Sequence, residues 1–117
     1  MDEGIALTPA PPYRAVIFTS RRTAADPEGY AAMAAAMNAL AMRQPGCLGA
    51  ESARGADGAG ITVSYWESPE ALRAWKHVAA HTAAQRAGRE RWYADYTVRV
   101  ARVEREYTLA DSPRDGL

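Results

Sequence analysis

The chain has 117 residues, 48% of them hydrophobic and 24% charged, which predicts one globular domain and argues against disorder. Its 14 basic and 14 acidic residues cancel, which disfavours nucleic-acid binding because that function needs a basic excess or stripe. The single cysteine, Cys47, excludes an internal disulfide and a cysteine-rich metal site. No apolar run approaches the ~18 residues of a membrane-spanning helix, and no stretch resembles a signal peptide. We therefore expect a cytoplasmic protein without a membrane partner.

Both ends of the chain lack a periodic pattern. Residues 1–12 are rich in proline, and residues 108–117 combine serine, proline and glycine. Such segments are typical of flexible termini. The predicted folded unit is therefore residues 13–107.

The first half of this unit predicts a strand, a helix and a second strand. Residues 13–20 are rich in β-branched and aromatic side chains, as strands are. Asp26 then offers an N-cap and Pro27 a first helical residue, followed by apolar residues at helical spacing. The helix should end before Pro45, which cannot continue it. Residues 48–54 predict a short strand.

The second half predicts a strand, a helix and a final strand. A turn at Ala56-Asp57-Gly58 joins residues 48–54 to the clearest strand, 61–67. Ser68 is the expected N-cap of a helix that runs to about Arg86, with Gly88 as its terminus. Residues 96–107 alternate as a strand does, with a phase slip that indicates a bulge near Ala101-Arg102.

The element order β-α-β-β-α-β is that of the ferredoxin-like α+β fold, in which two helices cover one face of a four-stranded antiparallel sheet. Large side chains occur on both faces of the predicted strands, since Ile17 precedes Phe18 and Tyr65 precedes Trp66. An apolar second face needs a cover. We expect a second copy of the chain there, in a homodimer; the alternative is a different protein.

Two histidines on the second helix are the polar outliers. His77 and His81 are four residues apart and share one helix face. Such a pair can chelate a metal, but the glutamate of the HExxH motif is missing and spacing supplies no third ligand, so we expect no metal site. Two interpretations stay open. The histidines are hydrogen-bonded or solvent-facing, or one of them lines a pocket and transfers protons.

Tryptophan and tyrosine gather in the second half of the chain, at Trp66, Trp75, Trp92, Tyr93 and Tyr96. Such residues usually form core or interface. The functional interpretation is a flat apolar pocket for an aromatic ligand.

Several motifs together resemble the antibiotic biosynthesis monooxygenase domain family. They are Gln44-Pro45-Gly46-Cys47-Leu48-Gly49, Ser64-Tyr65-Trp66-Glu67-Ser68-Pro69-Glu70, Trp75-Lys76-His77 with His81, and Gln85-Arg86-Ala87-Gly88-Arg89 with Trp92-Tyr93 and Tyr96. The resemblance covers residues 13–107. It implies a ferredoxin-like protomer and a homodimer whose two sheets form an α+β barrel.

Members of the family have different activities, and the fold alone does not indicate which activity a member has. Some members oxidise aromatic intermediates with dioxygen and no cofactor, whereas others bind and degrade haem. The haem branch uses an asparagine on the first strand, a tryptophan in the second helix and a histidine ten residues later. Trp75 matches the tryptophan of the haem branch. Phe18 stands at the asparagine position and Gln85 at the histidine position, which disfavours haem degradation. His81 remains a second possible haem ligand.

The resemblance therefore implies a cofactor-independent monooxygenase acting on an aromatic or quinol-type small molecule with dioxygen. His77 or His81 would be the base. The expected substrate-binding residues are Phe18, Trp66, Trp75, Gln85 and Trp92. The alternatives are a haem-binding or haem-degrading monooxygenase, and a non-enzymatic dimeric protein that binds a small ligand.

Overall fold

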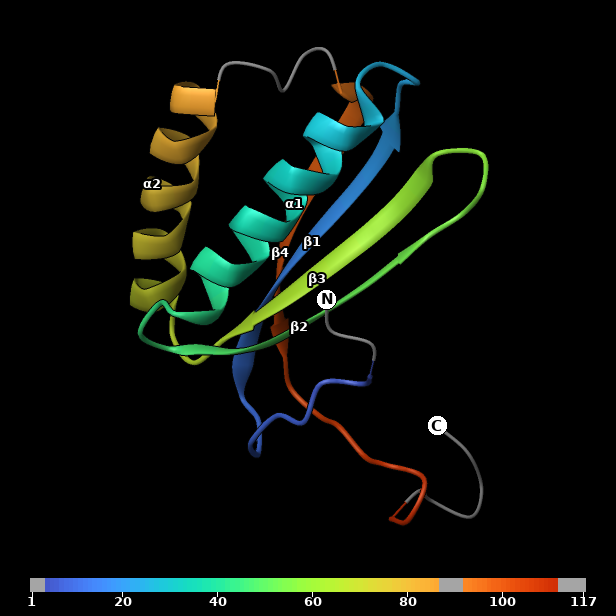
Figure 1. Cartoon of the computed structure of the whole chain (residues 1–117). Helices are drawn as coiled ribbons and strands as arrows, with labels where there is room; N and C mark the ends of the chain where they lie inside the picture. The colour runs from blue at the N-terminus through green and yellow to red at the C-terminus, as the bar shows by residue number, and fades with distance from the viewer. Residues whose placement is uncertain (1–3, 87–91, 112–117) are drawn as a thin grey trace.

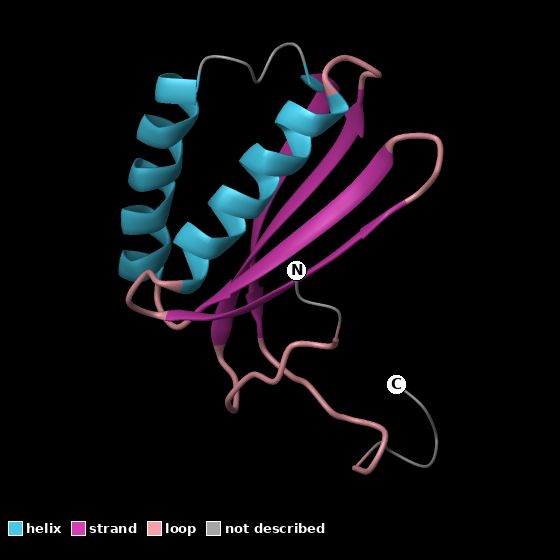
Figure 2. Cartoon of the chain, in the orientation of Figure 1, coloured by secondary structure: helices cyan, strands magenta, loops and turns pink. Residues whose placement is uncertain are grey.

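The computed structural model describes residues 4–86 and 92–111, with side chains described for residues 4–80 and 92–111. Its elements are β1 (Tyr13–Arg22), α1 (Pro27–Met42), β2 (Cys47–Arg54), β3 (Ala59–Trp66), α2 (Pro69–Arg86) and β4 (Tyr93–Val103). The strands form one antiparallel sheet in the order β2-β3-β1-β4, and both helices lie on the same side of it (Figures 1 and 2). The predicted β-α-β-β-α-β order and ferredoxin-like fold are confirmed.

Both helices begin at the predicted caps. The Oδ1 atom of Asp26 accepts a hydrogen bond from the N–H of Gly29 at 3.1 Å, and the Oγ atom of Ser68 accepts one from Ala71 at 3.1 Å. These bonds satisfy N–H groups that a helix leaves unpaired in its first turn. Beyond the end of α1, Gly46 has φ +85° and would place a Cβ 2.5 Å from the Cβ of Ala71. A glycine is required there because the turn passes close to the start of α2.

The prediction for the last strand was wrong in three respects, the first being that β4 begins at Tyr93 and not at Tyr96. β4 ends at Val103 because Val103 pairs with Tyr13, the first residue of β1, so later residues have no partner strand. The pairing is regular through Ala101 and Arg102, where a bulge was expected. The irregularity lies at the other end of β1, between Arg21 and Arg22.

The two faces of the sheet follow from the strand register. Trp66 faces the helices, because its ring stacks on Trp75 of α2. Cross-strand partners share a face, so Arg14, which pairs with Trp66, also faces the helices, together with Val16, Phe18 and Ser20 further along β1. The opposite, helix-free face carries Tyr13, Ala15, Ile17 and Thr19 of β1 and Ile61, Val63 and Tyr65 of β3.

Residues of the N-terminal arm contact the helix-free face near the start of β1. The N–H of Ala6 donates to Oε2 of Glu51 at 2.9 Å, while Oε1 of Glu51 accepts from the hydroxyl of Tyr65 at 2.7 Å. The hydroxyl groups of Thr8 and Tyr13 hydrogen-bond at 2.9 Å. The limits 13–107 of the folded unit and the flexibility of both ends stay predictions. Neither helix, as far as it is described, is long and apolar enough to cross the membrane.

The Trp66–Trp75 pair fixes α2 on the sheet. Trp66 is fully buried, and its ring is stacked on Trp75 with centroids 5.7 Å apart and 16° between the planes. Its indole N–H donates to the Oγ of Ser64 at 2.9 Å, so the buried donor is satisfied. This one side chain thus joins β3 to α2.

Replacing Trp66 with alanine should lower the free energy of unfolding by about 3–5 kcal/mol, because it leaves a cavity between β3 and α2. The measurement is chemical denaturation of the purified protein. Met42→Ala is the control, since the Met42 side chain is 50% exposed and its truncation should change stability by no more than about 0.5 kcal/mol. Equal losses in the two variants would contradict the anchoring role of Trp66.

Candidate functional site

The helix-facing side of β4 is not covered by the helices. Tyr96, Val98 and Val100 pair with Ser20, Phe18 and Val16 of β1 and therefore point to the side of the sheet that carries α1 and α2. They are nevertheless 40%, 46% and 50% exposed. We call these three residues of β4 the β4 strip. It is an apolar surface on the face where an ordinary two-layer domain would be closed.

The reason for this exposure is the position of α2. The helix packs against β3 through Trp75, and α1 packs against β2 and α2. In the strand order β2-β3-β1-β4, both contacts lie on the half of the sheet away from β4. The Tyr30 ring of α1 reaches β4 at Tyr93, and beyond that contact the strip lies open.

An aromatic cluster stands at one end of the β4 strip. The ring of Phe18 lies 5.4 Å from that of Tyr93 and 5.3 Å from that of Tyr96. Tyr93 in turn meets the ring of Tyr30, on α1, edge to face at 5.8 Å, and Trp92 lies 6.4 Å from Tyr30. Ring contacts of this kind are attractive beyond their buried area, so the cluster joins β1, α1 and β4.

Two arginines flank the Tyr30 ring. The guanidinium carbon of Arg22 lies 3.6 Å from the ring centroid and that of Arg54 lies 5.3 Å from it. Arg54 also donates from Nη2 to the Tyr30 hydroxyl at 2.9 Å and from Nη1 to the carbonyl oxygen of Gly58 at 2.7 Å. Burial raises the pKa of the Tyr93 hydroxyl, and the neighbouring Tyr30 raises it further. Tyr93 therefore stays protonated at neutral pH.

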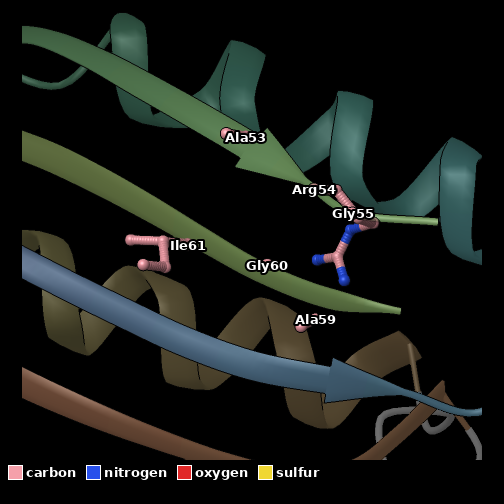
Figure 3. Close-up of a pocket in the computed structure, with 6 residues that line it drawn as sticks. All are labelled: Ala53, Arg54, Gly55, Ala59, Gly60 and Ile61. Carbon is pink, nitrogen blue, oxygen red and sulfur yellow. The ribbon is translucent and has the colours of Figure 1, made fainter. Parts of the chain in front are cut away.

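Arg54 also borders a shallow hollow at the tip of the β2–β3 hairpin. The hollow has a volume of about 380 Å³ and is lined by Ala53, Arg54, Gly55, Ala59, Gly60 and Ile61 (Figure 3). The Arg54 side chain reaches across β3 at Gly60, where an added Cβ would lie 2.6 Å from its guanidinium carbon. The absence of a side chain at Gly60 is what lets Arg54 lie there.

The structure divides the predicted substrate-binding residues into two groups. Trp66 and Trp75 are stacked together, whereas Phe18 and Trp92 belong to the aromatic cluster. Trp66 pairs with Arg14, four residues before Phe18, so the two groups lie about 13 Å apart along β1. The β4 strip pairs with residues 16–20 of β1, so it adjoins the aromatic cluster, whereas the Trp66–Trp75 pair lies on the other side of β1.

Of the two predicted bases, only His77 has a described side chain, and it lies apart from the aromatic cluster. His77 is exposed and follows Trp75 by two residues, which is about 200° around the helix. His81 and Gln85 lie in α2, but their side chains are outside the described residues. Within the described part of the chain, no three His, Cys, Asp or Glu side chains are placed to hold a metal ion.

Sequence reasoning missed the role of three residues. In the sequence analysis, Tyr30, Arg22 and Arg54 are assigned no site role. The arginines stand at strand ends, where a charged residue is normally solvated. No sequence pattern indicates that two strand ends and the first turns of α1 meet at one ring.

Comparison with known proteins agrees with this fold. The family model of the antibiotic biosynthesis monooxygenases matches residues 14–87. The uncharacterized protein YqjZ of Bacillus subtilis (strain 168) is 48% identical over 115 residues, which cover 98% of this chain and 100% of that protein.

Two solved structures show the same fold at low identity. The Shewanella oneidensis protein SO0527 has a TM-score of 0.67 and 12% identity, over 79% of this chain and 91% of that one. SnoaB from Streptomyces nogalater, a cofactor-independent oxygenase, has a TM-score of 0.61 and 19% identity, over 86% of this chain and 100% of that one. With most of its folded residues matched by the family model, this chain belongs to the antibiotic biosynthesis monooxygenase family.

Proposed function

We propose that the protein is a cofactor-independent monooxygenase that acts on an aromatic or quinol-type small molecule with dioxygen. The observation that carries the proposal is the β4 strip, an exposed apolar surface that adjoins an aromatic cluster. A flat aromatic ligand lying on it would bury apolar area against Phe18, Val98 and Val100. Family membership and the fold shared with SnoaB support the reaction type.

In this reaction the protein needs only to bind the substrate and to accept a proton from it. An acidic phenol or anthrone ionises to an electron-rich anion, which can itself reduce dioxygen. In an anthrone the methylene becomes a carbonyl, with one oxygen atom entering the product and the other leaving as water. The protein would hold the anion away from bulk water and accept its proton. Phe18, Trp66, Trp75, Gln85 and Trp92 would shape the binding surface, and His77 or His81 would be the base.

A charge in the middle of the β4 strip tests the binding surface. Val98→Asp should lower the rate of oxygen uptake with anthrone- and hydroquinone-like compounds by about 10-fold or more, because an apolar ligand would desolvate the new carboxylate. The fold should survive, since Val98 is 46% exposed. Ser52→Asp is the control, because it adds the same charge at an exposed position on β2, the far edge strand.

The assay is run without added metal, flavin or haem, and haem is titrated separately while the Soret absorbance is followed. We expect oxygen uptake without additives and no saturable Soret shift. Oxygen uptake that is the same in Val98→Asp, Ser52→Asp and wild-type protein would refute binding on the strip. A one-to-one Soret shift with bleaching on reduction in air would instead assign the chain to the haem branch.

The proton acceptor is tested with His77→Ala, His81→Ala and the double variant. Loss of a general base typically lowers the rate by about 10²–10⁴-fold, so we expect one single variant to account for the loss seen in the double variant. The measurement is oxygen uptake as a function of pH. A double variant as fast as wild type across the pH range would remove both histidines from the mechanism.

We further propose that the protein is a homodimer joined through the helix-free faces of two sheets. Ile17 and Val63 are half-buried there, and Ile61 is 48% exposed. An apolar sheet face of this kind needs a cover, and a self-complementary patch suits a two-fold dimer.

Light scattering at micromolar concentration should give twice the mass of the chain. Ile61→Asp should shift the protein towards the monomer, because a dimer would bury the new charge. Met42→Asp, which adds a charge at an exposed residue of α1, should leave the mass unchanged. A monomeric wild-type protein would disprove the proposed dimer.

A further inference from the structure

Two positive charges near Tyr30 lack a negative partner among the described residues. The ion pairs among the described residues join Arg21 to Asp57, Arg73 to Glu70 and Arg102 to Glu104. Arg54 is bound instead by neutral acceptors, and Arg22 lies on the face of the ring. Two guanidinium groups around one ring repel each other. A bound anion would remove that repulsion.

Two buried donors in the same cluster are also unpaired. The Nε atom of Arg22 and the Nε1 atom of Trp92 are buried without a hydrogen-bond partner among the described residues. The Trp92 side chain is only 6% exposed, and its backbone oxygen accepts from the N–H of Thr23 at 2.8 Å, which holds it beside the end of β1. Unpaired buried donors are rare because they destabilise the folded state. Because both atoms are buried, an acceptor supplied by a ligand would satisfy them once the side chains of the cluster move apart to admit it.

The cluster is continuous with the β4 strip. Ring contacts run from Phe18 to Tyr93 and from Tyr93 to Tyr30, the ring that carries Arg22. A flat ligand on the strip therefore has its end towards the two arginines. Guanidinium groups bind planar carboxylates with two parallel hydrogen bonds.

We propose that Arg22 and Arg54, with the indole N–H of Trp92, bind a carboxylate group carried by the aromatic ligand of the β4 strip. This inference rests on the proposed function and narrows its substrate class to aromatic acids. Gly60 is a positioning residue, because only a glycine leaves room for Arg54 to lie across β3. The ligand is held by its ring on the strip and by its charge at the cluster.

The test is calorimetric titration of the full chain with 2-naphthoate and with the neutral, similarly shaped 2-naphthamide. Wild-type protein should bind naphthoate at least about 10-fold more tightly than the amide, because hydrogen bonds to charged groups are the stronger ones. Added salt should weaken naphthoate binding and not amide binding.

The variants separate the charge from the ring surface. Arg22→Met should weaken naphthoate binding by about 10- to 100-fold and leave amide binding unchanged. Trp92→Phe, which keeps a ring and removes the N–H, and Gly60→Ala, which displaces Arg54, should each show a smaller loss of the same kind. Arg43→Met is the matched control, since Arg43 is an exposed arginine after α1, and it should bind both probes as wild type does. If Arg22→Met does not unfold cooperatively, Arg54→Met replaces it.

Each contrary result has a definite meaning. Equal affinity of wild type for naphthoate and naphthamide would overturn the carboxylate site while leaving an apolar binding surface. Equal losses in Arg22→Met and Arg43→Met would also overturn it, because the effect would then be one of general charge. Inorganic phosphate that binds as tightly as naphthoate would assign the cluster to phosphorylated ligands and overturn the proposal. Oxygen uptake from neutral phenols, with no naphthoate binding, would overturn this inference alone and keep the proposed function.

Discussion

The stacking of Trp66 on Trp75 is the contact that holds α2 against the sheet. Trp66 is fully buried and hydrogen-bonded to Ser64, so its place on β3 is fixed, and the stacked rings place α2 over that strand. Since β3 lies two strands from β4 in the sheet, a helix fixed there does not cover β4. On β4, Val98 and Val100 are left 46% and 50% exposed.

β1 is paired on both edges, with β3 and with β4, and its side chains contribute to both faces of the sheet. Its alternate residues place Phe18 towards the helices and Ile17 towards the helix-free face. The same alternation puts Phe18 and Arg22 on one face, four residues apart, so ring contact and positive charge follow each other along a single strand. A change in the register of β1 would therefore disturb the ligand surface and the proposed interface together.

Charged side chains on both sides of the sheet interact with tyrosines. Arg22 and Arg54 gather on the helix-facing side around Tyr30. On the helix-free side, Glu51 and Glu106 accept hydrogen bonds from the hydroxyls of Tyr65 and Tyr13. The bond from Tyr13 lowers the pKa of Glu106, and burial raises the pKa of Tyr13, so at neutral pH Glu106 accepts and Tyr13 donates.

The sequence by itself determined the order of the elements, both helix caps and the sharing of one helix face by His77 and His81, because these depend on neighbours within a few residues. It did not determine where β4 ends, since that depends on how far β1 extends beside it. Nor could it show that the β4 strip is exposed, which depends on a contact between β3 and α2. The arginine cluster depended most on tertiary structure, because its residues come from β1, α1, β2 and the segment before β4. Only the folded chain brings those segments to one ring.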